Sequence, residues 1–115
     1  MPATTDYSRG DVILVGFVFP DESGRKRRPC TVISSPLYQQ NRQDVIVAAI
    51  TTNTRRRLFG DHLIGDWRGA GLRFPSVATG VIRTIKQAMI DRKLGSLPGP
   101  DMGAIDQKLR RSLDF

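Results

Sequence analysis

The sequence predicts a small, mainly β domain that ends in one helix, and three observations support this fold class. The chain has 115 residues, of which 39% are apolar, so it can build one modest core but not a second domain. Short β-branched runs alternate with turn residues as far as about residue 89. From Asp101 onward the apolar spacing changes to steps of three and four residues, which is typical of an amphipathic helix. The helical positions are Met102, Ile105, Leu109 and Leu113.

The first strand is expected to follow an irregular N-terminus. Residues 1–8 have no periodicity and predict a loose leader, after which Val12–Phe19 is apolar throughout, as in a strand covered on both faces. Pro20 ends this run. The polar and basic stretch Asp21–Arg27 then predicts an exposed loop between two strands, a position that often carries function.

Two further strands form the centre of the predicted sheet. The second strand is expected from Arg28 to Ser34, and a short turn or single helical turn follows as far as Asn41. The third strand, Asp44–Thr51, is central, because its apolar run is too short for a typical helix and lies between polar turns.

The rest of the chain before the helix predicts short strands and turns. In order, we expect a basic loop at Asn53–Arg57, a short strand within Phe59–Ile64, a turn at Asp66–Gly71, β runs at Ser76–Ala78 and Val81–Met89, and a closing turn at Leu94–Pro98. The Asp66–Gly71 turn is Gly-rich but lacks the Gly-Lys-Ser/Thr ending of a phosphate-binding loop.

A candidate site emerges where the second strand begins and the third strand ends. If these strands share a sheet, the Arg28 cation and the Thr51 hydroxyl converge on one spot and offer a phosphate both positive charge and a hydrogen-bond donor. This pair suits phosphoryl chemistry. The alternative is that Arg28 is an ordinary solvated charge and Thr51 an ordinary strand-end residue.

The charge of the chain indicates a polyanionic partner. The formal net charge is +7, and the bases cluster in the runs Arg25–Arg28 and Arg55–Arg57, next to predicted strands. Nucleic acid is the first candidate partner, and an acidic protein that masks the same surface is the alternative. The candidate RNA-binding residues are Arg25, Lys26, Arg27, Thr52, Asn53, Arg55, Arg56 and Trp67. Trp67 either stacks on a base or packs against the core.

Other features argue against several classes of protein. No apolar stretch is long enough to span a membrane and the N-terminus is polar, so we expect a cytoplasmic protein. The single cysteine, Cys30, is expected to pack as a small core residue. His62 has no cysteine, acid or second histidine at metal-ligand spacing, so we expect no metal, no cofactor and no catalytic histidine.

Four stretches in order give the chain a family resemblance. These are Arg9-Gly10-Asp11-Val12, then Lys26-Arg27-Arg28-Pro29 before a Val/Ile strand, then Val47-Ala48-Ala49-Ile50-Thr51, and then Ile82-Arg83-Thr84-Ile85. Their order and spacing resemble the MazF/PemK family of toxin ribonucleases, from about Arg9 to the last helix. The resemblance implies a small SH3-like β-barrel of the MazF/PemK/CcdB type with a C-terminal helix, and a homodimer.

The same resemblance implies roles for individual residues. The family's arginine before a proline falls on Arg28, and its strand-ending threonine falls on Thr51. An acidic residue in the first long loop falls on Glu22 or Asp21, although this loop departs from the frequent Gly-Glu-Gln pattern. Some relatives carry an aspartate where this chain has Gly80, so no role is transferred there.

The implied activity is metal-independent cleavage of single-stranded RNA. RNA carries its own nucleophile, the 2′-OH, so an enzyme can act by aligning that oxygen and stabilising the charge of the transition state. The products would carry a 2′,3′-cyclic phosphate and a 5′-OH. The family also implies an acidic antitoxin partner, DNA binding together with that antitoxin, and growth arrest. The alternatives are a non-catalytic nucleic-acid-binding barrel and a gyrase-poisoning toxin of the same fold.

Overall fold

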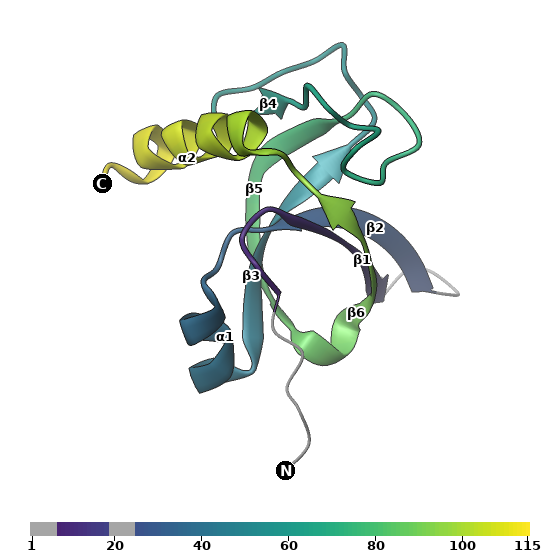
Figure 1. Ribbon diagram of the computed structural model, residues 1–115, viewed down its shortest axis with the longest axis vertical. Coiled ribbons are helices and arrows are strands. Elements are labelled where there is room, and N and C mark those ends of the chain that lie inside the picture. Colours follow the sequence, from purple (N-terminus) through teal and green to yellow (C-terminus); the bar gives the residue numbers. More distant parts are fainter. Residues whose placement is uncertain (1–6, 19–24) are drawn as a thin grey trace.

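The computed structural model describes residues 7–18 and 25–115, and within these ranges six antiparallel strands form one sheet. The strand order is β4-β5-β3-β2-β1-β6. The strands are β1 (Asp11–Val18), β2 (Arg25–Val32), β3 (Asp44–Thr51), β4 (His62–Leu63), β5 (Val77–Lys86) and β6 (Ile90–Ser96). The helices are α1 (Pro36–Arg42), the 3-10 turn η1 (Gln87–Met89) and α2 (Gly99–Leu113). Figure 1 shows α2 across one end of the curved sheet, beside β4 and β5, and α1 beside β3.

The predicted fold class is confirmed: a mainly β domain carries a C-terminal amphipathic helix. The central position and the bounds of the third strand are also confirmed, since β3 lies between β2 and β5. The curved sheet remains open, because in the described part of the chain β4 and β6 form its two edges and do not pair with each other. None of the described helices combines the length and apolar character that a membrane span requires.

The second strand begins earlier than its sequence suggested. β2 starts at Arg25, and its register with β1 runs as far as the pair Val18↔Arg25, so the bases before Arg28 belong to a strand and not to the predicted loop. The prediction was wrong because backbone pairing with β1 extends a strand regardless of side-chain charge when one face meets solvent. β2 also ends at Val32, two residues before the predicted end at Ser34.

Two predicted β runs in the second half form a single strand. β5 joins most of the runs that were expected at Ser76–Ala78 and Val81–Met89, because pairing with β3 on both sides of Gly80 continues the strand. A register shift occurs there, and the Thr79 hydroxyl donates to Ala49 O at 2.7 Å. The end of the second predicted run was wrong, since Gln87–Met89 forms η1. The expected turn at Leu94–Pro98 was also wrong in part, since β6 runs to Ser96 by pairing with β1.

The sheet buries a separate apolar core on each face. The first-face core contains Ile13, Val15, Phe17, Cys30, Val32, Val45, Val47 and Ile85, and the second-face core contains Val12, Ile50, Ile64, Ala70, Ala78, Leu97 and Ile105. Successive strand residues point to opposite faces, so adjacent residues such as Val12 and Ile13 enter different cores. The buried position of Cys30 agrees with its expected packing role.

Polar pairs attach the chain ends to the sheet. The Asp101 carboxylate, in the first turn of α2, accepts from His62 Nε2 at 2.8 Å and from the backbone N–H groups of Gly65 and Asp66 at 2.7 and 3.1 Å. His62 therefore helps to anchor α2 against β4. At the N-terminal end, Tyr7 exchanges two hydrogen bonds with the buried Gln39 side chain, so the predicted leader is held in place from Tyr7; residues 1–6 lie outside the described residues.

Candidate phosphate site at the end of the third strand

Arg28 and Thr51 line one hollow on the first face of the sheet. The β2–β3 pairing ends at Cys30↔Ala49, and Arg28 and Thr51 lie two residues beyond this pair on their strands, where both line the hollow. The hollow, here called the Arg28 pocket, has a volume of about 450 Å³. It is lined by Phe17, Arg28, Pro29, Ala49, Ile50, Thr51, Thr52, Val81 and Arg83. The two residues singled out in the sequence thus face a common space at one end of the first-face core.

The Thr51 hydroxyl is oriented by the turn that follows β3. Its oxygen accepts from the backbone N–H of Asn53 at 3.1 Å, and the Asn53 side-chain oxygen accepts from the N–H of Arg55 at 3.3 Å. A hydroxyl has one proton to donate besides its acceptor sites, so Thr51 keeps its O–H for a ligand in the pocket. Thr51 is half-buried, and the hydrogen bond from Asn53 N–H holds its hydroxyl oxygen against the turn.

Arg83 is a pocket residue that sequence reasoning did not select. It lies on β5 opposite Val47, on the first face, and its guanidinium lies 4.9 Å from the centroid of the Phe17 ring. A cation over an aromatic face is attracted to the ring, so Phe17 helps to orient Arg83. Burial raises the pKa of the Cys30 thiol to about 11, and the Arg83 charge works in the opposite direction. One sequence signal could have identified Arg83. Side chains two residues apart on a strand lie on the same face, so Arg83 was expected on the same face as the apolar Ile85.

The basic run on β2 divides between the two faces of the sheet. Arg28 and Lys26 alternate with Arg27, whose Nε lies 3.4 Å from the Asp91 carboxylate on β6. Arg27 therefore points away from the Arg28 pocket, and only the Lys26 side chain is expected to extend the basic surface on the Arg28 side. The structure describes Arg25 as the first residue of β2 and not its side chain.

The candidates after β3 lie at the mouth of the pocket or beyond it. Thr52 lines the pocket, whereas Asn53 supports the turn, and Arg55 and Arg56 are exposed further along the segment. Asp61 closes this segment, because its carboxylate accepts from the N–H groups of Leu58 and Gly80, both at 2.8 Å.

Trp67 lies on the other face of the sheet. Its ring packs partly buried against the second-face core, and the Arg68 guanidinium lies 4.9 Å from its centroid. Trp67 does not line the Arg28 pocket, so the structure favours its packing alternative over base stacking at that site.

Acidic and metal-binding groups are not part of the described pocket. The residues that the structure describes in its lining include no carboxylate, and Glu22 and Asp21 lie outside the described residues. Nor do residues 7–18 and 25–115 contain a group of three or more His, Cys, Asp or Glu side chains arranged to hold a metal ion. What the described pocket offers is the guanidinium groups of Arg28 and Arg83 together with the Thr51 hydroxyl, a set of donors suited to a phosphate group.

Comparison with known proteins places this arrangement in context. A family model described as "PemK-like, MazF-like toxin of type II toxin-antitoxin system" matches residues 8–113. No curated protein sequence matches the chain significantly.

Several solved structures share the fold. MazE–MazF from Deinococcus radiodurans matches with a TM-score of 0.79 and 17% identity, over 96% of this chain and 99% of that chain. A mycobacterial endoribonuclease in complex with its cognate antitoxin has a TM-score of 0.74 and 21% identity, with coverage of 95% and 96%. The Mycobacterium tuberculosis toxin MazF-mt6 has a TM-score of 0.73 and 24% identity, with coverage of 91% and 97%.

Proposed function

Because the chain belongs to the PemK-like, MazF-like toxin family of type II toxin-antitoxin systems, we propose that it is a sequence-specific endoribonuclease that cleaves single-stranded RNA. Cleavage of mRNA would block translation and arrest growth. The protein would act as one domain, in the cytoplasm, where mRNA is translated. The observation that carries the proposal is the placement of Arg28, Arg83 and Thr51 around one pocket of about 450 Å³.

Arg28 is proposed to stabilise the transition state. When the 2′-OH attacks the adjacent phosphorus, negative charge builds on the non-bridging oxygens, and a planar guanidinium can hold two of them at once. A guanidinium carries hydrogen-bond donors and no acceptor, so Arg28 acts as an electrostatic donor and not as a base. Arg83, held over Phe17, adds a second positive charge to the same pocket.

Thr51 is proposed to position a phosphate oxygen. Its hydroxyl oxygen accepts from Asn53 N–H, which leaves the O–H proton to point at the ligand. An oriented donor is effective in catalysis because it needs no reorganisation as the charge develops. Thr51 and Arg28 together would hold the scissile phosphate in line with the attacking 2′ oxygen.

Glu22 is proposed as the group that removes the 2′-OH proton, with Asp21 or a bound water as alternatives. Both acids follow β1 in sequence, and Phe17, near the end of β1, lines the Arg28 pocket. A carboxylate is a suitable base for this step if it lies within hydrogen-bond reach of the 2′-OH. In this step the bond from the 2′ oxygen to phosphorus forms as the bond from phosphorus to the 5′ oxygen breaks. The carboxylate takes the proton of the 2′-OH, and the leaving 5′ oxygen takes a proton from water or from that carboxylic acid, so no oxidant or reductant is needed.

The proposal includes two macromolecular partners. The chain carries +7, so two copies in a homodimer would provide +14 and a longer basic groove for RNA. An acidic antitoxin segment would bind in the same groove, placing carboxylates near Arg28 and excluding RNA. The mycobacterial endoribonuclease of similar fold, which is in complex with its cognate antitoxin, and the Deinococcus MazE–MazF structure support this part of the proposal.

The test is cleavage of a single-stranded RNA library by the purified protein, with and without EDTA. Sequencing of the 5′ ends is expected to show one short recognition sequence, with 2′,3′-cyclic phosphate and 5′-OH ends and undiminished activity in EDTA. An RNA with a 2′-deoxy sugar at the cut should resist cleavage. RNA binding without cleavage would contradict the proposal and indicate a non-catalytic binding barrel.

A further inference from the structure

A second hollow lies next to the Arg28 pocket. It has a volume of about 290 Å³ and is here called the Phe74 pocket. It is lined by Leu14, Pro29, Thr52, Gly71, Leu72, Arg73, Phe74, Ser76, Arg92 and Leu94. Pro29 and Thr52 line both hollows, so the two pockets adjoin at the end of β3.

The floor of the Phe74 pocket faces away from Arg28. Arg28 and Pro29 are neighbours on β2, so their side chains point to opposite faces of the sheet. On the Pro29 side, Leu14 pairs with Pro29 on β2 and with Arg92 on β6. These three residues therefore form one row across β2, β1 and β6.

The wall of the Phe74 pocket is held firmly against β6. Gly71, with φ of +83°, approaches so closely that an added Cβ would lie 2.1 Å from Leu94 O, and a Cβ on Gly95 would lie 2.5 Å from Ala70 O. This contact requires glycine on both sides. Further along the segment, the Ser76 hydroxyl donates to Phe74 O at 2.8 Å. Phe74 is thus 62% exposed on a backbone that is fixed at both ends.

We propose that the Phe74 pocket binds the base of the nucleotide next to the scissile phosphate. The inference rests on the proposed ribonuclease function and adds to it a site that selects sequence. A phosphate at Arg28 and Thr51 places the neighbouring nucleotide at Pro29 and Thr52, the residues common to both hollows. From there the base turns over the end of β3 and stacks on the Phe74 ring.

The chemistry of the pocket fits an unstacked base. Sequence-specific proteins bind single-stranded RNA by stacking splayed bases on aromatic rings or guanidinium planes and by hydrogen bonds to base edges. Here Phe74 supplies the ring, Leu14 and Leu72 supply apolar contact, and the Thr52 hydroxyl lies where the two pockets meet. Arg73 and Arg92 place positive charge beside the phosphates that flank the base. A volume of 290 Å³ lies at the small end of ligand pockets and suits one base.

A double-mutant cycle between protein and RNA tests the assignment. The substrate is an RNA oligonucleotide with the mapped cleavage sequence, and each nucleotide around the cut is replaced in turn by an abasic one. Phe74→Ala should lower kcat/KM roughly tenfold to a hundredfold, with most of the loss in KM. At one position beside the cut, the abasic RNA should lower kcat/KM of the wild-type protein by a similar factor. With the Phe74→Ala protein, the same abasic RNA should cause little further loss of kcat/KM, because the protein and RNA changes remove the same contact.

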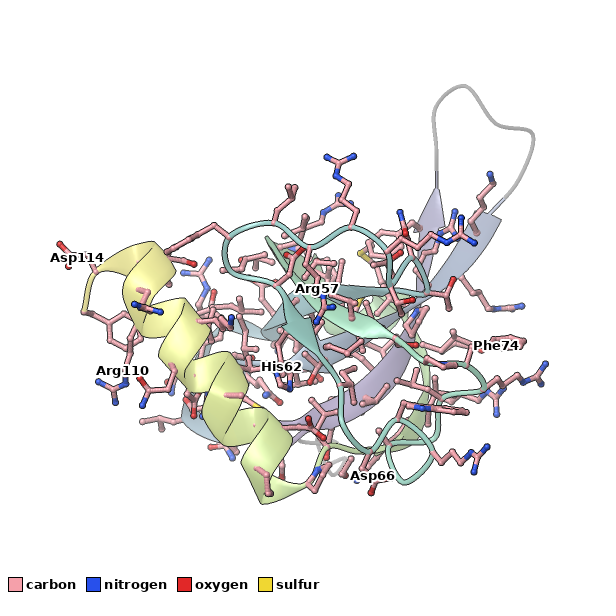
Figure 2. The ribbon with its side chains drawn as sticks, turned by 90° about the horizontal axis from the view of Figure 1, so that it is seen from above. Arg57, His62, Asp66, Phe74, Arg110 and Asp114 are labelled. Atoms are coloured by element: carbon pink, nitrogen blue, oxygen red, sulfur yellow. The ribbon has the colours of Figure 1, made fainter. Side chains whose placement is uncertain are left out.

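Phe115→Ala is the matched control. Phe115 is 70% exposed and directly follows Asp114, which lies on the opposite side of the molecule from Phe74 (Figure 2). It should leave both kcat/KM and the abasic profile unchanged. Thermal unfolding of each variant checks that the fold is kept.

The possible failures are distinguishable. If the wild-type protein does not cleave RNA, the proposed function itself is wrong. If the protein cleaves RNA but the losses of kcat/KM from Phe74→Ala and from the abasic nucleotide are independent at every position, Phe74 does not contact a base there. The base site is then wrong and the ribonuclease function stands. A folded Phe74→Ala protein that cleaves the RNA with unchanged kcat/KM would also overturn the assignment.

Discussion

The two faces of the sheet bury apolar cores of similar composition but differ in what lies at their edges. The second-face core is covered by α2 and by the segment that carries Ile64 and Ala70. The first-face core runs from Ile13 through Phe17 to the Arg28 pocket, which is open to solvent. The second face, here called the closed face, is therefore covered by secondary structure except at the Phe74 pocket beside β6. The first face, here called the open face, ends in the exposed cations of the Arg28 pocket.

The polar groups at these edges differ in the same way. On the closed face, Asp101 pairs with His62, and Asp106 accepts from Arg9, so acids near α2 hold structure together. In the Arg28 pocket, the described lining provides guanidinium groups and a hydroxyl without a carboxylate. The difference indicates that the part of the closed face under α2 contributes stability, and that the Arg28 pocket holds its positive charge ready for an anionic ligand.

The largest expected effect is on the closed face. Ile105 of α2 is 4% exposed within the second-face core, so Ile105→Ala should lower the free energy of unfolding by about 2–5 kcal/mol through lost burial and a cavity. Urea denaturation followed by circular dichroism measures this loss. Leu113→Ala, on the same helix but 58% exposed, is the control and should change stability by less than about 0.5 kcal/mol. Equal losses for the two variants would contradict the role of the buried Ile105 side chain in holding α2 against the closed face.

On the open face, Arg28→Ala should reduce activity and leave stability unchanged. Loss of one preorganised donor to the transition state typically costs about 100- to 1000-fold in rate, or about 2.7–4 kcal/mol. Arg28 is exposed, so the unfolding midpoint should stay the same. Single-turnover cleavage of the mapped RNA sequence measures the rate, and Arg111→Ala, an exposed arginine on α2, is the control. Wild-type rates from a folded Arg28→Ala protein would remove Arg28 from the site.

Thr51→Ala tests the positioned hydroxyl and should have a smaller effect. A hydrogen bond to a charged group contributes about 1.5–3 kcal/mol, so the cleavage rate should fall roughly tenfold to a hundredfold. Thr51→Ser keeps the hydroxyl that accepts from Asn53 and should retain most of the activity. If Thr51→Ser is as slow as Thr51→Ala, the methyl group and not the hydroxyl is what matters at this position.

The smallest effect concerns the pH dependence of stability on the closed face. Burial alone would raise the pKa of Asp101, but hydrogen bonds from Gly65, His62 and Asp66 outweigh it and lower the pKa overall. A depressed pKa in the folded state adds stability above the unfolded-state value of about 3.9, and this stability is lost as pH falls through the folded-state pKa. Asp101→Asn should therefore be less stable at pH 7 and should lose less stability than wild type between about pH 4 and pH 2. Urea denaturation at each pH measures the free energy of unfolding of both proteins. An equal loss of that free energy in the two proteins between about pH 4 and pH 2 would contradict the role of Asp101.

The sequence predicted the elements that have strong local signals. The β-branched run of β3, with polar residues at both ends, gave the bounds Asp44–Thr51, and the spacing of Ile105 and Leu109 predicted the C-terminal helix. Where local signals were weak, pairing decided the outcome. Gly80 would interrupt an isolated strand, yet β5 continues through it because β3 provides hydrogen-bond partners on either side of a register shift.

For the candidate site, the sequence indicated the kinds of side chain that would bind a phosphate, but it did not show the complete set of residues that meet in the pocket. Arg28 and Thr51 stood out because a β2–β3 pairing, if present, would bring the two strand ends together. Arg83 is more than fifty residues from Arg28 in sequence and enters the pocket only through the β3–β5 register. The Phe74 pocket was not foreseen at all, since it requires β6 to return beside β1 and the Gly71 backbone to rest against Leu94.

The sequence by itself determined the class of the fold, the positive charge and the family, because periodicity, composition and short motifs are properties of neighbouring residues. Only the tertiary structure decided which cations face the pocket. Because side chains alternate along β2, Arg28 lies on one face of the sheet and Arg27 lies on the other, beside Asp91. Which of the two faces the pocket depends on the pairing register of β2. The physical reason is that strand pairing joins residues far apart in the chain, and the face on which each side chain lies changes with a shift of one residue.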